Sequence, residues 1–417
     1  MNEEINWKNI IFYSTFLILT IILIELFVQP MNYIKLDFVK DFFKKIAISQ
    51  NIAPQRLFIN AWRTTKNSYI DETLNNQDWS YWRRRYFKHI KTIDDANVAI
   101  NSMLSSLNDP YSKFLLSNSF AKQKVLLDSK ITGVGILFDK TGDDIVINHV
   151  IANSSAYTAN IQVGDTIVKI NGKDTKNIDM EKIIAELGSG KTKKVVMTVK
   201  RGDILITKEL TKKDIFLSTM NYKITKDNIG IITLSNVMGQ KAVYNFKQTL
   251  IATNNTKGLI IDLRNNYGGI LANAIQMANF MMKEDEIVRV KSRVNREYQI
   301  YSENDRIFKE KPVVILVNNK TASAAEILAG TLQANIGAVL IGENTFGKNA
   351  IQLVIPMPNG TGLILTTDKY ILPDGRDIHK IGVEPDIIVK KPLVTSKKDY
   401  QLEKAKKIVS EMVKNKK

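Results

Sequence analysis

The residues that could do chemistry in this chain lie in four glycine-containing or turn-forming segments of its last third. Each follows an apolar strand pattern, and α/β proteins bind ligands at the ends of their strands. The segments are 262–269 (DLRNNYGG), 318–326 (NNKTASAAE), 342–352 (GENTFGKNAIQ) and 370–376 (YILPDGR). Taken singly they are weak signals, since Ser323 between two alanines is typical of a helix cap and Lys348 of a surface charge. The function of these segments is therefore inferred from their combination and from the kinds of site that the composition of the chain excludes.

Composition excludes several kinds of site. The 417 residues contain no cysteine, which removes disulfides, thiol nucleophiles, iron–sulfur clusters and cysteine-bound zinc. The three histidines, His89, His149 and His379, stand alone without metal-ligand spacing. We therefore predict no metal site and no cofactor, and we expect a catalytic base other than histidine.

The elements that must position these segments form an α/β unit. Between 214 and 394, apolar strands at 229–234, 258–263 and 313–317 alternate with helices at 240–252, 270–282 and 322–333. This alternation is typical of an α/β layer with buried strands.

The combination of segments resembles the C-terminal processing peptidases, also called tail-specific proteases, over roughly residues 55 to 390. The resemblance includes the segments 62–71 and 107–112 (LNDPYS) and, most specifically, DLRNNYGG, ASAAE and TFGK in the family's order. It places the nucleophilic serine on Ser323, the catalytic lysine on Lys348 and an assisting glutamine on Gln352. It implies an α/β (α+β) multidomain protein with a spiral protease core of the crotonase/Clp-like type, acting as a serine endopeptidase near the C-termini of protein or peptide substrates.

Three positions depart from the family pattern. Tyr267 stands where proline is usual, Lys320 and Thr321 replace Gly-Ser, and Asn349 replaces a glycine. None of them removes a catalytic group, so the departures concern loop shape and rate.

The implied chemistry makes demands on the lysine. An amine with an ordinary pKa near 10.4 can act as a base only if burial lowers that pKa. We therefore expect Lys348 in an apolar pocket beside Phe346, without a carboxylate partner, and Gln352 orienting the amine. A tight pair with Glu326 or Asp262 would weaken the assignment of the base.

The developing oxyanion needs backbone donors close to the serine. The natural candidates are the amides of Ala324, Gly268 and Gly269, because glycine lets the chain approach a negative charge closely.

Residues 130–213 change to short alternating strands and resemble a PDZ domain inserted before the catalytic domain. Gly133, Val134, Gly135 and Ile136 fit the loop whose amides capture a peptide carboxylate, and the segment 162–172 (QVGDTIVKING) strengthens the resemblance. Such a domain would recognise substrate tails or gate activity on them.

The N-terminal region predicts an anchor. After a tail at 1–9, residues 10–28 form an apolar run of 19 with Glu25 as its only charge, long enough to span a bilayer. We predict an uncleaved single-pass anchor in the cell membrane. The lysines that follow it would keep the protein cytoplasmic by the positive-inside rule, whereas the family resemblance implies an extracytoplasmic catalytic part.

The remaining segments complete the organisation. Residues 33–120 are predicted to be a helical region. Residues 395–417 are predicted to be a basic, solvated amphipathic helix. The resemblance implies that terminal helices can form a homodimer.

The net charge of +17 is spread along the chain and is read as compositional background. The cluster at 81–86 (YWRRRY) would suit base stacking beside phosphate contacts, but its helical flanks favour core positions for its aromatic residues. No nucleic-acid partner is predicted.

Two other functions are open to the same residues. One is an inactive PDZ scaffold that binds protein tails without cutting them, against which the joint presence of serine, lysine and glutamine argues. The other is an acyl-CoA hydratase-like enzyme, which also uses glycine-lined oxyanion amides but offers no reason for a PDZ insert.

Overall fold

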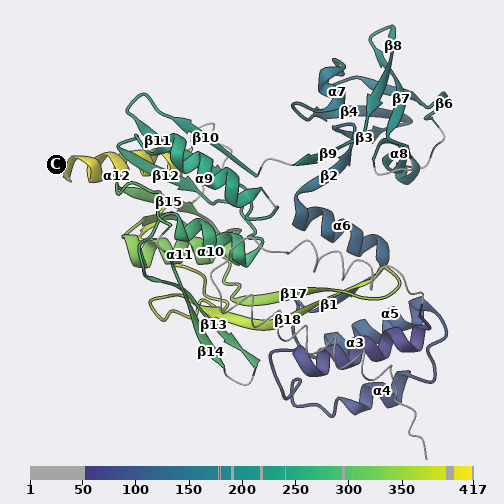
Figure 1. Ribbon diagram of the computed structural model, residues 1–417, viewed down its shortest axis with the longest axis horizontal. Coiled ribbons are helices and arrows are strands. Elements are labelled where there is room, and N and C mark those ends of the chain that lie inside the picture. Colours follow the sequence, from purple (N-terminus) through teal and green to yellow (C-terminus); the bar gives the residue numbers. More distant parts are fainter. Residues whose placement is uncertain are drawn as a thin grey trace, which may run out of the picture.

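The computed structural model describes residues 52–176, 178, 180–188, 192–216, 219–239, 241–293, 296–303, 305–390 and 399–415. The predicted tail at 1–9 and membrane anchor at 10–28 lie outside these residues. Among the helices that are described, none is both long enough and apolar enough to cross a bilayer. Figure 1 shows a helical region, a small β domain and a larger α/β domain.

The N-terminal helical region contains α3 (Pro54–Ser68), α4 (Ser80–Tyr86) and α5 (Ile93–Ser105). Pro54 opens α3, where a missing N–H costs no hydrogen bond. Thr92 and Asp95 form a capping box that starts α5. Leu57, Phe58 and Ile100 are fully buried where α3 and α5 pack together. The described part of the predicted region 33–120 thus contains these three helices, whereas Lys113–Leu115 near its end forms a strand.

The expectation of core positions for the aromatic residues of the 81–86 cluster holds in part, since Trp82 and Tyr86 pack against the core and Tyr81 does not. No residue of α4 is buried, and Tyr81 is 43% exposed. Trp82 stacks on Tyr86 with ring centroids 6.1 Å apart, and the Arg85 guanidinium lies 5.8 Å from the ring of Tyr81. Trp82 and Tyr86 are partly buried and pack against the core of the helical region, where Tyr86 meets Phe58 edge-on with ring centroids 6.4 Å apart.

The PDZ-like domain is attached by two antiparallel strands, β2 (Lys130–Gly133) and β9 (Lys213–Phe216), so the chain enters and leaves side by side. Helix α6 (Ser117–Asp128) leads into β2. The domain's sheet has the order β3-β4-β5-β7-β8, with β6 paired to β5. Asn171 and Gly172 both have positive φ, as a two-residue hairpin turn requires. The elements of this domain are β3 (Ile136–Thr141), β4 (Asp144–Val150), α7 (Ser155–Thr158), β5 (Thr166–Ile170), β6 (Lys173–Asp174), α8 (Met180–Leu187), β7 (Lys194–Arg201) and β8 (Ile204–Thr211).

The larger domain is built on a six-stranded sheet with the order β10-β11-β12-β15-β16-β19. All neighbours are parallel except β10 and β11. The strands are β10 (Met220–Ile224), β11 (Ile229–Leu234), β12 (Gly258–Asp262), β15 (Val313–Val317), β16 (Val339–Gly342) and β19 (Ile387–Ile388). The predicted α/β architecture is confirmed.

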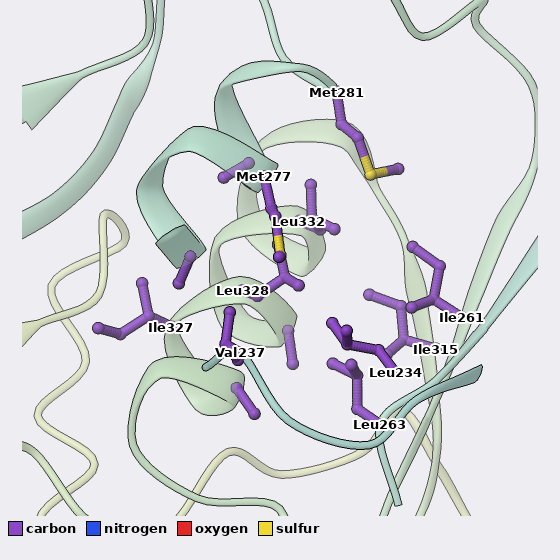
Figure 2. Packing of buried hydrophobic residues seen from close by; sticks show 14 of the residues in the cluster. Leu234, Val237, Ile261, Leu263, Met277, Met281, Ile315, Ile327, Leu328 and Leu332 are labelled. Carbon is purple, nitrogen blue, oxygen red and sulfur yellow. The ribbon is translucent and has the colours of Figure 1, made fainter. Parts of the chain in front are cut away.

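Helices cover both faces of this sheet. Helices α9 (Ala242–Thr253), α10 (Leu271–Asn279) and α11 (Ala324–Ile336) pack on one face, where Ile261 and Ile315 lie. Figure 2 shows Met277 and Leu328 in this core. Their strand neighbours Ile260 and Val314 face the opposite helix, α12 (Tyr400–Asn415). Successive strand residues are therefore buried on alternate faces, which explains the unbroken apolar runs.

The C-terminal helix is not fully solvated, contrary to the prediction. Ala405 and Val409 of α12 are completely buried on the sheet, and a Cβ added to Gly258 of β12 would lie 2.5 Å from Val409 Cγ2. The helix is amphipathic as predicted, but its apolar stripe is part of the core because it covers the strands that lead to the site.

A second sheet joins the α/β domain to the helical region (Figure 1). Its order is β1-β18-β13-β14, and β17 pairs with β18. Leu363 and Leu365 of β18 are buried against α3 and α5. Strands β13, β14 and β17 are not among the predicted elements. The strands of this sheet are β1 (Lys113–Leu115), β13 (Glu286–Ser292), β14 (Glu297–Tyr301), β17 (Ala350–Pro356) and β18 (Gly362–Ile371).

Candidate active site

Three of the four candidate segments converge at the carboxyl ends of the parallel strands. The loop after β12 carries Gly268, and the loop after β15 carries Ser323 at the start of α11. A Cβ added to Gly268 would lie 3.0 Å from Ser323 Cβ and 2.5 Å from the carbonyl oxygen of Ala322. Only glycine allows this approach, so the glycine loop and the serine touch.

Ser323 has a strained backbone. Its φ of 55° and ψ of −123° lie in a region that residues with a Cβ rarely adopt. The surrounding structure holds this conformation: the amide of Ser323 donates to Glu326 Oε2 at 2.7 Å, and the hydroxyl of Tyr370 donates to the Ser323 carbonyl at 3.2 Å. The half-buried serine is thus fixed at a sharp strand-to-helix turn.

Glu326 links the serine to the lysine. Its side chain is fully buried, and Oε2 accepts the amide of Lys348 at 2.9 Å as well as that of Ser323. Oε1 accepts the amide of Gly347 at 2.7 Å and the hydroxyl of Thr345. Burial raises the pKa of Glu326, and these four hydrogen bonds oppose the shift. One carboxylate therefore holds the main chain of both residues predicted to be catalytic.

The amine of Lys348 is half-buried and lies 4.8 Å from the centre of the Tyr111 ring. Burial is the main reason that the pKa of Lys348 is lowered, and the positive charge of Lys113 acts in the same direction. Asp109 and Glu326 oppose it from a distance. No ion pair joins this amine to a carboxylate in the part of the chain that the structure describes. Glu326 binds the backbone amide of Lys348 and forms no ion pair with the side-chain amine.

The aromatic neighbour of the amine differs from the expected one. Phe346 is 52% exposed, and the ring at the amine belongs to Tyr111 of the helical region. The carboxylate of Asp109 positions the segment that carries Tyr111, because it accepts hydrogen bonds from the Tyr111 amide at 3.0 Å and from the Ser112 hydroxyl at 2.6 Å. The segment 107–112 pointed to this element, but its contact with the lysine depends on tertiary structure.

The predicted oxyanion donors differ in availability. The amide of Gly268 donates to Asn266 Oδ1 at 2.9 Å, so it is occupied within its own loop. Among the described residues, the amides of Gly269 and Ala324 have no hydrogen-bond acceptor. Two of the three predicted donors therefore have amides without an acceptor in the described part of the chain, and that of Ala324 follows Ser323 directly in the chain.

Gln352 does not contact the amine in this structure. Its Nε2 donates to the Ala350 carbonyl at 3.3 Å, next to a bulge in β17. Its role towards Lys348 remains a prediction.

The predicted peptide-binding loop lies at the start of the PDZ-like sheet. Gly135 has φ of +90°, and a Cβ there would lie 2.1 Å from Ser154 Cβ. The amide of Val134 donates to the carbonyl of Leu187 at the end of α8, at 3.2 Å. Gly133 ends β2 and Ile136 begins the edge strand β3. The four residues therefore connect the tethering strand to an edge strand that a peptide could extend.

No group of three or more histidine, aspartate or glutamate residues within the described ranges is arranged to hold a metal ion.

Serine, free amides and a desolvated lysine on neighbouring loops, with a PDZ-like insert, define a serine-type peptidase. Residues 228–389 match the model of peptidase family S41, and residues 125–200 match that of the PDZ domain. The chain is 35% identical to a carboxyl-terminal-processing protease of Picosynechococcus, covering 80% of this chain and 83% of the relative. It is 31% identical to a chloroplastic carboxyl-terminal-processing peptidase of Arabidopsis thaliana, covering 79% of this chain and 68% of the relative.

Among solved structures, the photosystem II D1 C-terminal processing protease is similar with a TM-score of 0.55 and 26% identity, covering 86% of this chain and 98% of that one. The chain belongs to peptidase family S41, as a serine-type member of the carboxyl-terminal-processing proteases with a PDZ domain.

Proposed function

We propose that this chain is a membrane-anchored endopeptidase that cleaves protein substrates near their C-termini, with Ser323 as nucleophile and Lys348 as general base. The observation that carries the proposal is the shared carboxylate of Glu326, which binds the amides of both residues. A half-buried lysine amine lies beside Tyr111 and forms no ion pair with any described residue.

The geometry supports the following sequence. Neutral Lys348 removes the proton from the Ser323 hydroxyl, whose oxygen attacks the scissile carbonyl. The amides of Ala324 and Gly269 stabilise the negative oxygen of the tetrahedral intermediate. Protonated Lys348 then donates its proton to the leaving amine, and water hydrolyses the acyl-enzyme with the lysine acting again as base.

The test compares the wild type with Ser323→Ala and Lys348→Arg on an unstructured protein that has a free C-terminus. Arginine keeps the charge and length of lysine but cannot become neutral. We expect both variants to lose at least about 10³-fold in kcat/KM without loss of thermal stability. An active Ser323→Ala would exclude the nucleophile, and an active Lys348→Arg would exclude the base.

The alternative of an inactive scaffold predicts tail binding without cleavage. Binding of a labelled C-terminal peptide to the wild type and to Ser323→Ala, measured beside cleavage, separates the two functions. Peptide binding by a wild type that cuts nothing would favour the scaffold.

We also propose that residues 10–28 anchor the chain in the cell membrane and that the catalytic part is extracytoplasmic. The apolar run supports the anchor, and the family resemblance supports the side. Protease added to intact spheroplasts should degrade the catalytic part. Its survival, while an external marker is degraded, would place it in the cytoplasm.

A further inference from the structure

The C-terminal helix begins at the glycine loop of the active site. Asp399 caps α12, since its Oδ1 accepts the amide of Leu402 at 3.0 Å. The same carboxylate receives two hydrogen bonds from the guanidinium of Arg264, both at 2.8 Å. Arg264 is the second residue after β12, in the loop that carries Gly268 and Gly269.

Arg264 is held from both sides. Asp262 accepts its Nε at 2.9 Å and its Nη2 at 2.6 Å, and Gln401 of α12 accepts its Nη1 at 3.1 Å. The side chain of Arg264 is only 17% exposed. Its hydrogen bonds are the main reason that the pKa of Asp399 is lowered. A planar, bidentate guanidinium between two carboxylates fixes direction as well as charge.

Helix α12 is itself fixed to the sheet. Val409 packs against Gly258, and Gln401 Nε2 donates to the carbonyl of Val389 at 2.6 Å. The end of the helix that contacts Arg264 is therefore a rigid support.

The loop after Arg264 carries this constraint to the oxyanion donors. Asn266, two residues on, is fully buried; its Nδ2 donates to the carbonyl of Leu234 at 2.8 Å and its Oδ1 accepts the amide of Gly268. Its carbonyl accepts the amide of Ala322 at 2.9 Å, next to Ser323. A shift of Arg264 would thus move the glycines relative to the serine.

We propose that Arg264 and Asp399 are positioning residues, through which α12 holds the loop at 264–269 so that the Gly269 amide faces the developing oxyanion. This inference rests on the proposed function for the identity of the oxyanion donor. The pair is only partly buried, with the Asp399 side chain 42% exposed, and such a pair adds little to stability, so a geometric role is the sharper hypothesis.

The test uses Asp399→Asn in the full chain, with Glu411→Gln as the matched control. Both replace a carboxylate of the same C-terminal segment by an amide, but Glu411 pairs with Lys407 on the exposed side of α12. We expect Asp399→Asn to lower kcat about tenfold with little change in KM, Asp399→Glu to restore part of it, and the control to match the wild type.

A second readout separates positioning from general destabilisation. A peptide boronate forms a tetrahedral adduct with the serine, so its affinity reports the oxyanion donors, whereas binding of an uncleaved peptide to Ser323→Ala does not. We expect boronate affinity to fall in parallel with kcat in Asp399→Asn, and binding of the uncleaved peptide to a Ser323→Ala/Asp399→Asn variant to stay unchanged.

Equal boronate affinity in Asp399→Asn and wild type would overturn the inference, as would an equal loss of activity in Glu411→Gln. If the wild type forms no boronate adduct, the proposed function fails and the inference fails with it. Adduct formation that is insensitive to Asp399 removes this inference alone.

Discussion

The loops around Ser323 and the PDZ loop are both glycine turns whose amides we propose to bind a negative group, and the two are held in different ways. Buried side chains hold the catalytic loops, with Glu326 and Asn266 fully enclosed and bonded to loop amides. Main-chain hydrogen bonds hold most of the PDZ loop, including a 3.2 Å bond from Val134 to the end of α8, and one long side-chain bond joins Ser154 Oγ to the Gly135 carbonyl at 3.4 Å. Buried side-chain acceptors impose a single geometry, because leaving their hydrogen-bond partners unsatisfied costs free energy. The loops around Ser323 are therefore held in one geometry, whereas the Val134 amide of the PDZ loop is bonded only to a main-chain carbonyl, that of Leu187.

The largest effect is expected from replacing Glu326, the buried carboxylate that binds the amides of Ser323 and Lys348. Glu326→Gln keeps the shape of the side chain but replaces one of its two acceptor oxygens by an NH₂ group. That group would face the N–H and O–H donors that now bind the carboxylate. Each lost hydrogen bond to a buried charged group costs about 1–3 kcal/mol. We expect kcat/KM to fall at least about 100-fold and the free energy of unfolding to fall by about 2–4 kcal/mol, measured by peptide cleavage and denaturant titration.

The control for this change is Glu209→Gln, which removes an exposed carboxylate from β8 of the PDZ-like domain. It should leave both quantities unchanged. Cleavage by Glu326→Gln within twofold of the wild type would show that the shared carboxylate does not organise the site.

The role of Glu326 also marks the limit of what the sequence predicts. The segment ASAAE contains Glu326, but its partners Thr345, Gly347 and Lys348 follow an entire helix and strand later. The positions of the serine and the lysine come from the order of the motifs, and their meeting on one carboxylate comes from the fold. The expected neighbour Phe346 was wrong for the same reason, since Tyr111 lies 237 residues before the lysine.

The two sheets differ in the same respect. The parallel strands β11, β12 and β15 are buried on both faces, so they stand out as continuous apolar runs and are predicted nearly to the residue. Strands β13 and β14 mix exposed and buried residues, and β13 also pairs with β18, some 80 residues later. A local sequence pattern does not predict which distant strands pair. The second sheet contains β1, which follows Tyr111 and so brings that residue to the site.

A smaller effect is expected in the PDZ loop, where two glycines form a matched pair. Gly135 and Gly164 have φ of +90° and +92°, so alanine is strained at both. At Gly135 the new Cβ would lie 2.1 Å from Ser154 Cβ, whereas at Gly164 nothing lies within 4 Å. We expect Gly135→Ala to weaken binding of a C-terminal peptide about tenfold or more, and Gly164→Ala to cost about 1 kcal/mol of stability with binding unchanged.

Fluorescence polarisation of a labelled peptide measures both variants, and thermal unfolding measures the strain. Cleavage of a short peptide that does not reach the PDZ-like domain should stay within about twofold of the wild type in either variant. Equal peptide binding in the two variants would mean that the loop at Gly135 is not the carboxylate site.

The smallest effect is expected from replacing Lys113 of β1, whose positive charge acts on the Lys348 amine. The positive charge of Lys113 lowers the pKa of Lys348, so Lys113→Gln should raise that pKa. In the proposed mechanism the neutral amine is the base, so kcat/KM rises with pH through this pKa, and the rise should move to higher pH in the variant. Lys113 is exposed, so the loss of activity below the pKa should be under about threefold at low salt and smaller at high salt. Lys122→Gln, an exposed change on α6, should leave the profile unchanged. A shift to lower pH in Lys113→Gln would mean that the group titrating with activity is not the Lys348 amine, because removing a nearby positive charge can only favour the protonated form of a base.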